Sequence, residues 1–108
     1  MNLRELSEDI CKINEEHGWH TPLPSVANLV ANLHSEVSEL WEAYRKNELH
    51  APSAHKGLEL TCAEEELADI VIRAIDTAHL LGVDISFAVE MKVAYNRTRP
   101  YRHGGKIA

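Results

Sequence analysis

The chain has 108 residues, of which 44% are hydrophobic and 26% are charged, a composition typical of one globular domain. No apolar run approaches the roughly 18 residues of a membrane-spanning helix, and acidic residues near the N-terminus argue against a signal peptide, so we expect a cytoplasmic protein. The net charge is −6, yet residues 92–108 contain no acid and several bases. An acidic body with a basic tail argues against nucleic-acid binding by the whole fold.

Apolar residues at helical spacing predict four helices and no strand. The first begins near Leu3 and ends near Gly18. The second covers 26–44, after Ser25 as its N-cap. Its apolar stripe includes Leu29, Val30, Leu33 and Val37.

The third predicted helix lies within 61–81, where Thr61 followed by Glu64 fits a capping box, and Gly82 ends it. Leu67 and Val71 belong to an apolar face wide enough to touch more than one neighbour. The fourth helix follows an Asp84 cap and runs to about Asn96. We therefore predict an all-α, four-helix bundle-like fold, oligomeric, with one domain over 1–108 and a basic tail at 97–108.

Two acidic pairs stand in different helices: Glu36 with Glu39, and Glu66 with Asp69. A spacing of three residues puts both members of a pair on one helix face, where like charges repel. On a helical wheel Glu36 also falls inside the apolar arc of its helix, which is costly for an unpaired carboxylate. These patterns favour a bound cation, although a solvated acidic face is the commoner meaning of either pair alone.

Oxygen ligands alone select hard cations, and Mg²⁺ is the commonest of these in phosphate chemistry, with Mn²⁺ as a substitute. We therefore predict Glu36, Glu39, Glu66 and Asp69 as metal ligands. Several other polar residues are candidate contacts for a phosphate or sugar. They are Lys92, Asn96 and Arg99 near the C-terminus, and Asn32 and Asp76, which flank the acidic pairs. Asp76 is equally well explained as a surface residue.

The motifs resemble those of MazG-like nucleotide pyrophosphohydrolases, in the all-α NTP pyrophosphatase superfamily. That family has an E-E-x-x-E block and an E-x-x-D block on two antiparallel helices. This chain reads S-E-V-S-E over 35–39 and E-L-A-D over 66–69, and its segment 92–106 resembles the closing segment of small members. The resemblance covers about residues 25–106. Ser35 stands where the family's first block begins with an acid.

The resemblance implies Mg²⁺-dependent hydrolysis of nucleoside triphosphates to a monophosphate and pyrophosphate, in nucleotide-pool sanitation. It implies a water nucleophile, held or deprotonated by Glu39 and assisted by Glu36, and a homodimer or a dimer of dimers. Three alternatives stay open: a dUTPase-like enzyme, a phosphoribosyl-ATP pyrophosphatase, and a non-catalytic helical interaction module that docks through its acidic face.

Overall fold

The computed structural model describes residues 1–101 and contains four helices. They are α1 (Leu3–Glu16), α2 (Val26–Arg45), α3 (Cys62–Leu80) and α4 (Ile85–Thr98). Within this range no strand forms, and the β-type pairing is an isolated bridge between Pro52 and Thr61. The all-α, four-helix prediction is confirmed.

Local sequence explains where the helices begin and end. The Ser25 hydroxyl accepts a hydrogen bond from the backbone N–H of Asn28 and caps α2. Thr61 and Glu64 form the reciprocal capping box of α3. The side chain of Asp84 caps α4. All three predicted caps are confirmed.

The third helix ends where predicted, and the fourth runs slightly further than predicted. Gly82, just after α3, has a φ of +73°, a conformation that glycine adopts without steric cost. Helix α4 continues two residues beyond Asn96, to Thr98. Arg99 is then extended, because Pro100 disfavours a helical conformation for the residue before it.

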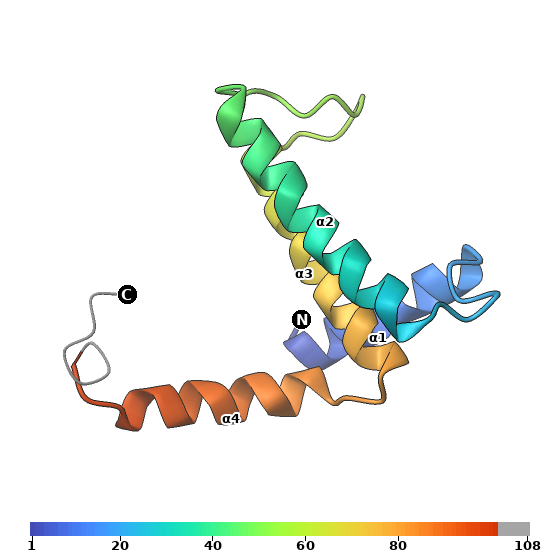
Figure 1. Cartoon of the computed structure of the whole chain (residues 1–108), viewed down its shortest axis with the longest axis vertical. Helices are drawn as coiled ribbons and strands as arrows, with labels where there is room; N and C mark the ends of the chain where they lie inside the picture. The colour runs from blue at the N-terminus through green and yellow to red at the C-terminus, as the bar shows by residue number, and fades with distance from the viewer. Residues whose placement is uncertain (102–108) are drawn as a thin grey trace.

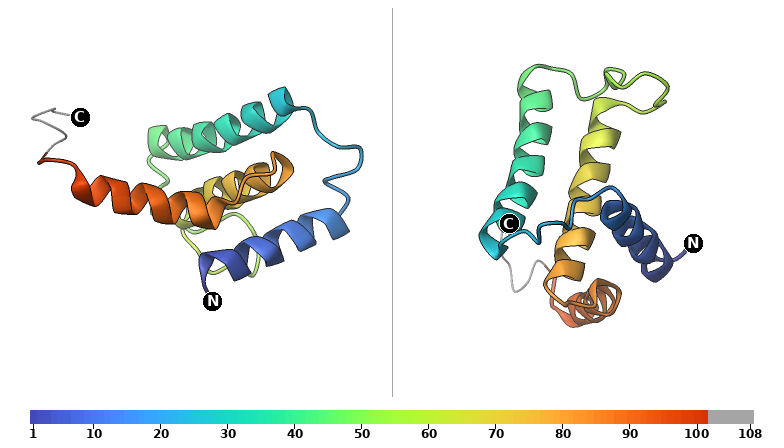
Figure 2. Two further views of the ribbon diagram at one scale, coloured as in Figure 1. Left: turned by 90° about the horizontal axis from the view of Figure 1, so that it is seen from below. Right: turned by 90° about the vertical axis from the view of Figure 1, so that its right-hand side faces the viewer.

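Helices α2 and α3 form a long antiparallel pair, and α1 packs against α3 (Figure 1). Helix α4 contacts α1 and α3 but not α2, and it runs away from the α2–α3 pair (Figures 1 and 2). The rest of the predicted basic tail, including Arg102, His103 and Lys106, lies outside the described residues.

The hydrophobic core of the single chain is small. It centres on Ile10, Cys11 and Ile75, against which Leu3 and Ile85 pack. The chain exposes 8437 Å², whereas a compact protein of 12.2 kDa exposes about 6,100 Å². Much apolar surface is thus left uncovered when the chain is alone.

The uncovered surface includes the apolar stripes of α2 and α3. Leu67 and Val71 on α3 are 52% and 51% exposed, and Val30 and Val37 on α2 are exposed as well. The acidic face of α3, by contrast, is partly covered: Glu66 and Asp69 are half-buried. None of the helices among residues 1–101 is long and apolar enough to cross a membrane.

Candidate metal centre

The two acidic pairs meet across the α2–α3 interface. Because the helices are antiparallel neighbours, Glu36 and Glu39 on α2 lie opposite Glu66 and Asp69 on α3. One carboxylate oxygen from each residue lies within 4.8 Å of the others. The residues predicted as metal ligands are thus brought together in space, although they come from segments about 30 residues apart.

The four carboxylates differ in their surroundings. The side chain of Glu36 is only 14% exposed and accepts a hydrogen bond of 3.0 Å from the Arg73 guanidinium. Glu39 is exposed to solvent, while Glu66 and Asp69 are half-buried. The cluster therefore has a closed side at Glu36 and an open side at Glu39.

Burial and mutual repulsion make the cluster unfavourable without a cation. Burial raises the pKa of Glu66 to about 7, with further contributions from the charges of Glu39 and Asp69. Burial also raises the pKa of Asp69, and the charge of Glu36 adds to this effect. An oxygen of Glu66, Oε2, is buried and lacks a hydrogen-bond partner within the described chain. An unsatisfied carboxylate oxygen within a set of oxygen donors fits a hard divalent cation.

Neighbouring acids on α3 have other partners. Glu64 belongs to the capping box, and hydrogen bonds from Thr61 lower its pKa. Glu65 accepts a short hydrogen bond from the Ser53 hydroxyl and lies 3.0 Å from His55. These contacts tie the α2–α3 loop to the start of α3, and the candidate ligand set stays at four residues.

One pocket adjoins the closed side of the cluster, and a larger pocket lies next to it. The smaller, of about 200 Å³, is lined by Glu36 and Asp69 together with Trp19, Arg73 and Asp76. Trp19, Arg73 and Asp76 also line a larger pocket of about 640 Å³. The two cavities therefore share a wall beside the acidic cluster.

The larger pocket lies between the α1–α2 loop and the start of α2. Trp19, 69% exposed, and Asn28 line it, together with Asn32, a substrate contact predicted from the sequence. Its size suits a drug-sized or nucleoside-sized ligand.

Asp76 is a buried residue and not a surface one. Its Oδ1 lies 2.9 Å from Nε2 of His20, and the two side chains are only 8% and 9% exposed. This contact fastens the α1–α2 loop to α3. Sequence reasoning placed Asp76 near the site but did not find its partner, because no local pattern links residues 56 positions apart.

The residues predicted on the fourth helix do not reach the acidic cluster within one chain. Lys92, Asn96 and Arg99 lie on or just after α4, which points away from α2 and α3 (Figure 1). The Lys92 ammonium instead lies 4.9 Å from the centre of the Tyr95 ring, and the Arg99 guanidinium lies 5.8 Å from it.

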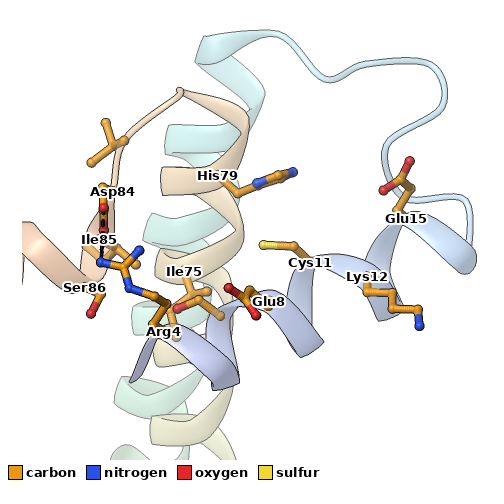
Figure 3. Close-up of a pocket in the computed structure, with 12 residues that line it drawn as sticks. Arg4, Glu8, Cys11, Lys12, Glu15, Ile75, His79, Asp84, Ile85 and Ser86 are labelled. Carbon is orange, nitrogen blue, oxygen red and sulfur yellow. Dashed lines mark hydrogen bonds and ion pairs between the residues drawn. The ribbon is translucent and has the colours of Figure 1, made fainter. Parts of the chain in front are cut away.

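A separate cavity of about 380 Å³ lies among α1, α3 and the start of α4 (Figure 3). Arg4 and Asp84 form an ion pair of 3.3 Å at its edge, and Cys11 and His79 also line it. Burial and the charge of Asp76 raise the pKa of the Cys11 thiol, so the thiol is protonated and weakly nucleophilic at neutral pH. None of the four acidic-cluster residues lines this cavity.

Comparison with known proteins finds one informative similarity. A segment of 36 residues is 50% identical to a dATP/dGTP diphosphohydrolase of Cyanophage S-2L. The segment covers 33% of this chain and 34% of the relative, so the chain matches about a third of that protein's length. No protein-family model matches the chain, and no solved structure matches it.

Proposed function

We propose that this chain is a Mg²⁺-dependent, MazG-like nucleotide pyrophosphohydrolase that converts a nucleoside triphosphate, ribo or deoxy, to a monophosphate and pyrophosphate. The observation that carries this proposal is the convergence of Glu36, Glu39, Glu66 and Asp69 beside a pocket of nucleoside size. The short similarity to a dATP/dGTP diphosphohydrolase supports hydrolysis of a nucleotide phosphoanhydride. A cytoplasmic role in nucleotide-pool sanitation is part of the proposal.

In this proposal the four carboxylates hold Mg²⁺, which would neutralise charge on the phosphates. Glu39 lies on the open side of the cluster and positions the attacking water, from which its carboxylate takes a proton. Without a metal, Glu36 accepts a hydrogen bond from Arg73, which holds its carboxylate beside the other three. Asp69 is the fourth proposed metal ligand and lies on α3 with Glu66. Because this chain has Ser35 where the family's first block begins with an acid, no fifth carboxylate is added to these ligands.

The nucleoside lies in the larger pocket. Trp19 offers an exposed aromatic face for stacking on a base, and the amides of Asn28 and Asn32 offer donors and acceptors for the base or sugar. This pocket shares Trp19, Arg73 and Asp76 with the smaller pocket, which Glu36 and Asp69 line. In our proposal the triphosphate of a nucleotide bound in the larger pocket extends through the smaller one toward the carboxylates.

A second copy of the chain completes the site in our proposal. The apolar stripes of α2 and α3 are exposed. The exposed surface of one chain exceeds that of a compact protein by an amount comparable to the roughly 1,000–2,500 Å² that each chain of a stable homodimer buries. Helix α4 projects from the single chain (Figure 1). A partner's α4 would then bring Lys92 and Asn96 to the phosphates, as a homodimer or a dimer of dimers.

The test is a panel of nucleoside and deoxynucleoside triphosphates, with phosphoribosyl-ATP included, assayed for pyrophosphate release with Mg²⁺. We expect release from at least one substrate, and a loss of about 100-fold or more in Glu39→Gln and Glu66→Gln. The matched control is Glu42→Gln, which removes an exposed glutamate of α2 outside the cluster. If no substrate is cleaved, or if both variants keep the wild-type rate, the proposal is wrong.

The same panel separates the enzyme alternatives, because dUTP or phosphoribosyl-ATP as the preferred substrate would indicate the corresponding activity. Calorimetry with Mn²⁺ addresses the non-catalytic alternative. A protein that binds neither Mg²⁺ nor Mn²⁺, with or without a nucleotide, would be a docking module and not an enzyme.

A further inference from the structure

Arg73 occupies an unusual place on α3. It follows Asp69 by four residues and precedes Asp76 by three, so all three residues share one helix face. Its guanidinium donates to Glu36 at 3.0 Å, across the α2–α3 interface. Arg73 therefore contacts the acidic cluster directly, and on α3 it lies between Asp69 of the cluster and the buried Asp76.

Arg73 also lines both pockets beside the cluster. No other lysine or arginine of the described chain lines either pocket, whereas carboxylates line both. A nucleotide bound there carries several negative charges and would meet an acidic environment. Arg73 is the cation that this chain itself places between the nucleoside pocket and the metal ligands.

The pairing of Arg73 with Glu36 competes with cation binding. A guanidinium at hydrogen-bond distance neutralises one carboxylate of the four, and a divalent ion among the same carboxylates would repel that guanidinium. An arginine displaced from Glu36 keeps its planar set of donors, which matches the oxygens of a phosphate.

We propose that Arg73 exchanges partners during substrate binding. In the metal-free protein it holds Glu36 as a substitute cation. When the four carboxylates close on a divalent ion, Arg73 leaves Glu36 and donates to a phosphate of the bound nucleotide. This inference rests on the proposed function, and it adds a phosphate-binding residue from the same chain as the ligands.

The experiment compares wild-type protein with Arg73→Gln and Arg73→Lys in two calorimetric titrations, neither of which requires turnover. The first measures Mn²⁺ binding without nucleotide. We expect Arg73→Gln to bind Mn²⁺ about fivefold more tightly, because the competing cation is gone. The second measures inorganic tripolyphosphate binding in saturating Mn²⁺, where we expect Arg73→Gln to bind at least about tenfold more weakly.

Arg73→Lys keeps the charge but not the planar set of donors, so we expect near wild-type Mn²⁺ affinity and intermediate tripolyphosphate affinity. If Arg73→Gln does not fold, Arg73→Lys still tests the proposal through its tripolyphosphate affinity. The matched control is Arg45→Gln, which removes an exposed ion pair of 2.9 Å with Glu42 on α2. Arg45 lines neither pocket, and both affinities should stay at the wild-type value.

Unchanged Mn²⁺ affinity in Arg73→Gln would overturn the partner exchange. Tighter Mn²⁺ binding with unchanged tripolyphosphate binding would also overturn it, because Arg73 would then act on the cluster alone. A wild-type protein that binds both probes but cleaves no nucleotide would contradict the proposed function and leave these two results readable.

Discussion

Glu66 on α3 and Glu39 on α2 lie in one cluster across the helix pair, and the charge of Glu39 contributes to the elevated pKa of Glu66, about 7. Burial makes the larger contribution. In a metal-free protein this carboxyl is therefore protonated over much of the acidic range. The raised pKa of Glu66 makes the folding stability depend on pH, and it predicts that cation binding depends on pH as well.

The first prediction concerns the stability of the metal-free protein. Glu66 binds its proton more tightly in the folded state than in the unfolded state, where its pKa is near 4.5. The free energy of unfolding should therefore fall as the pH rises from about 4.5 to 7, by up to about 3 kcal/mol, and then level off. Asp69, whose pKa is also raised, acts in the same direction.

Urea unfolding in a chelator at pH 5 and pH 8 measures this change. Glu66→Gln should reduce the difference between the two pH values, whereas Glu42→Gln, at an exposed position, should not. A metal-free protein that is equally stable at both pH values would contradict the prediction.

The second prediction is that divalent cations stabilise the fold. A cation that binds only the folded state at about 100 times its dissociation constant adds about 2.7 kcal/mol. The gain should be larger at pH 8 than at pH 6, because Glu66 must lose its proton to act as a ligand. The difference between thermal unfolding in Mg²⁺ or Mn²⁺ and thermal unfolding in a chelator measures this gain in stability.

Asp69→Asn should remove most of this gain, whereas Asp9→Asn, an exposed position on α1, should keep it. Equal thermal shifts in both variants would mean that the cation binds elsewhere.

The third prediction concerns the buried contact between His20 and Asp76. His20→Ala leaves the Asp76 carboxylate buried without its partner, which should cost about 2–3 kcal/mol of stability. Because the contact fastens the α1–α2 loop to α3, the variant should also bind a nucleotide more weakly. Urea denaturation and nucleotide titration measure the two effects.

His17→Ala is the matched control, since His17 is exposed and belongs to the same loop. If both histidine variants lose the same small amount of stability, the contact contributes little to the fold.

Local chemistry made the helices predictable. The capping box of Thr61 and Glu64 and the stop at Gly82 depend on residues within a few positions of each other, so a linear pattern contains them. The acidic pairs were found for the same reason, since a spacing of three residues defines one helix face. Their meeting in space was expected from the resemblance to a family with two antiparallel helices.

Contacts between distant segments were not predictable in this way. The pairing of Arg73 with Glu36 joins residues 37 positions apart and depends on the register of α2 against α3. The direction of α4 depends on the turn between Gly82 and Asp84 and on packing, not on the pattern within α4. Consequently the sequence suggested Lys92 as a phosphate contact, but it did not indicate that α4 makes no contact with α2 and runs away from the acidic cluster within one chain.

The last prediction is that the exposed stripe of α3 is a dimer interface. Leu67→Glu and Val71→Glu each place a carboxylate on this stripe, and burying an unpaired charge costs several kcal/mol. The dissociation constant of the dimer should therefore rise by at least about 100-fold. Analytical ultracentrifugation should give twice the 12.2 kDa of one chain for the wild type, and one chain mass for these variants at micromolar concentration. Lys46→Glu, an exposed change outside the stripe, should remain dimeric.

Because the four acidic residues come from one chain and Lys92 would come from its partner, the monomeric variants should keep Mn²⁺ binding and lose pyrophosphate release. A wild-type protein that sediments as a monomer, or a monomeric variant with full activity, would exclude a site shared between two copies.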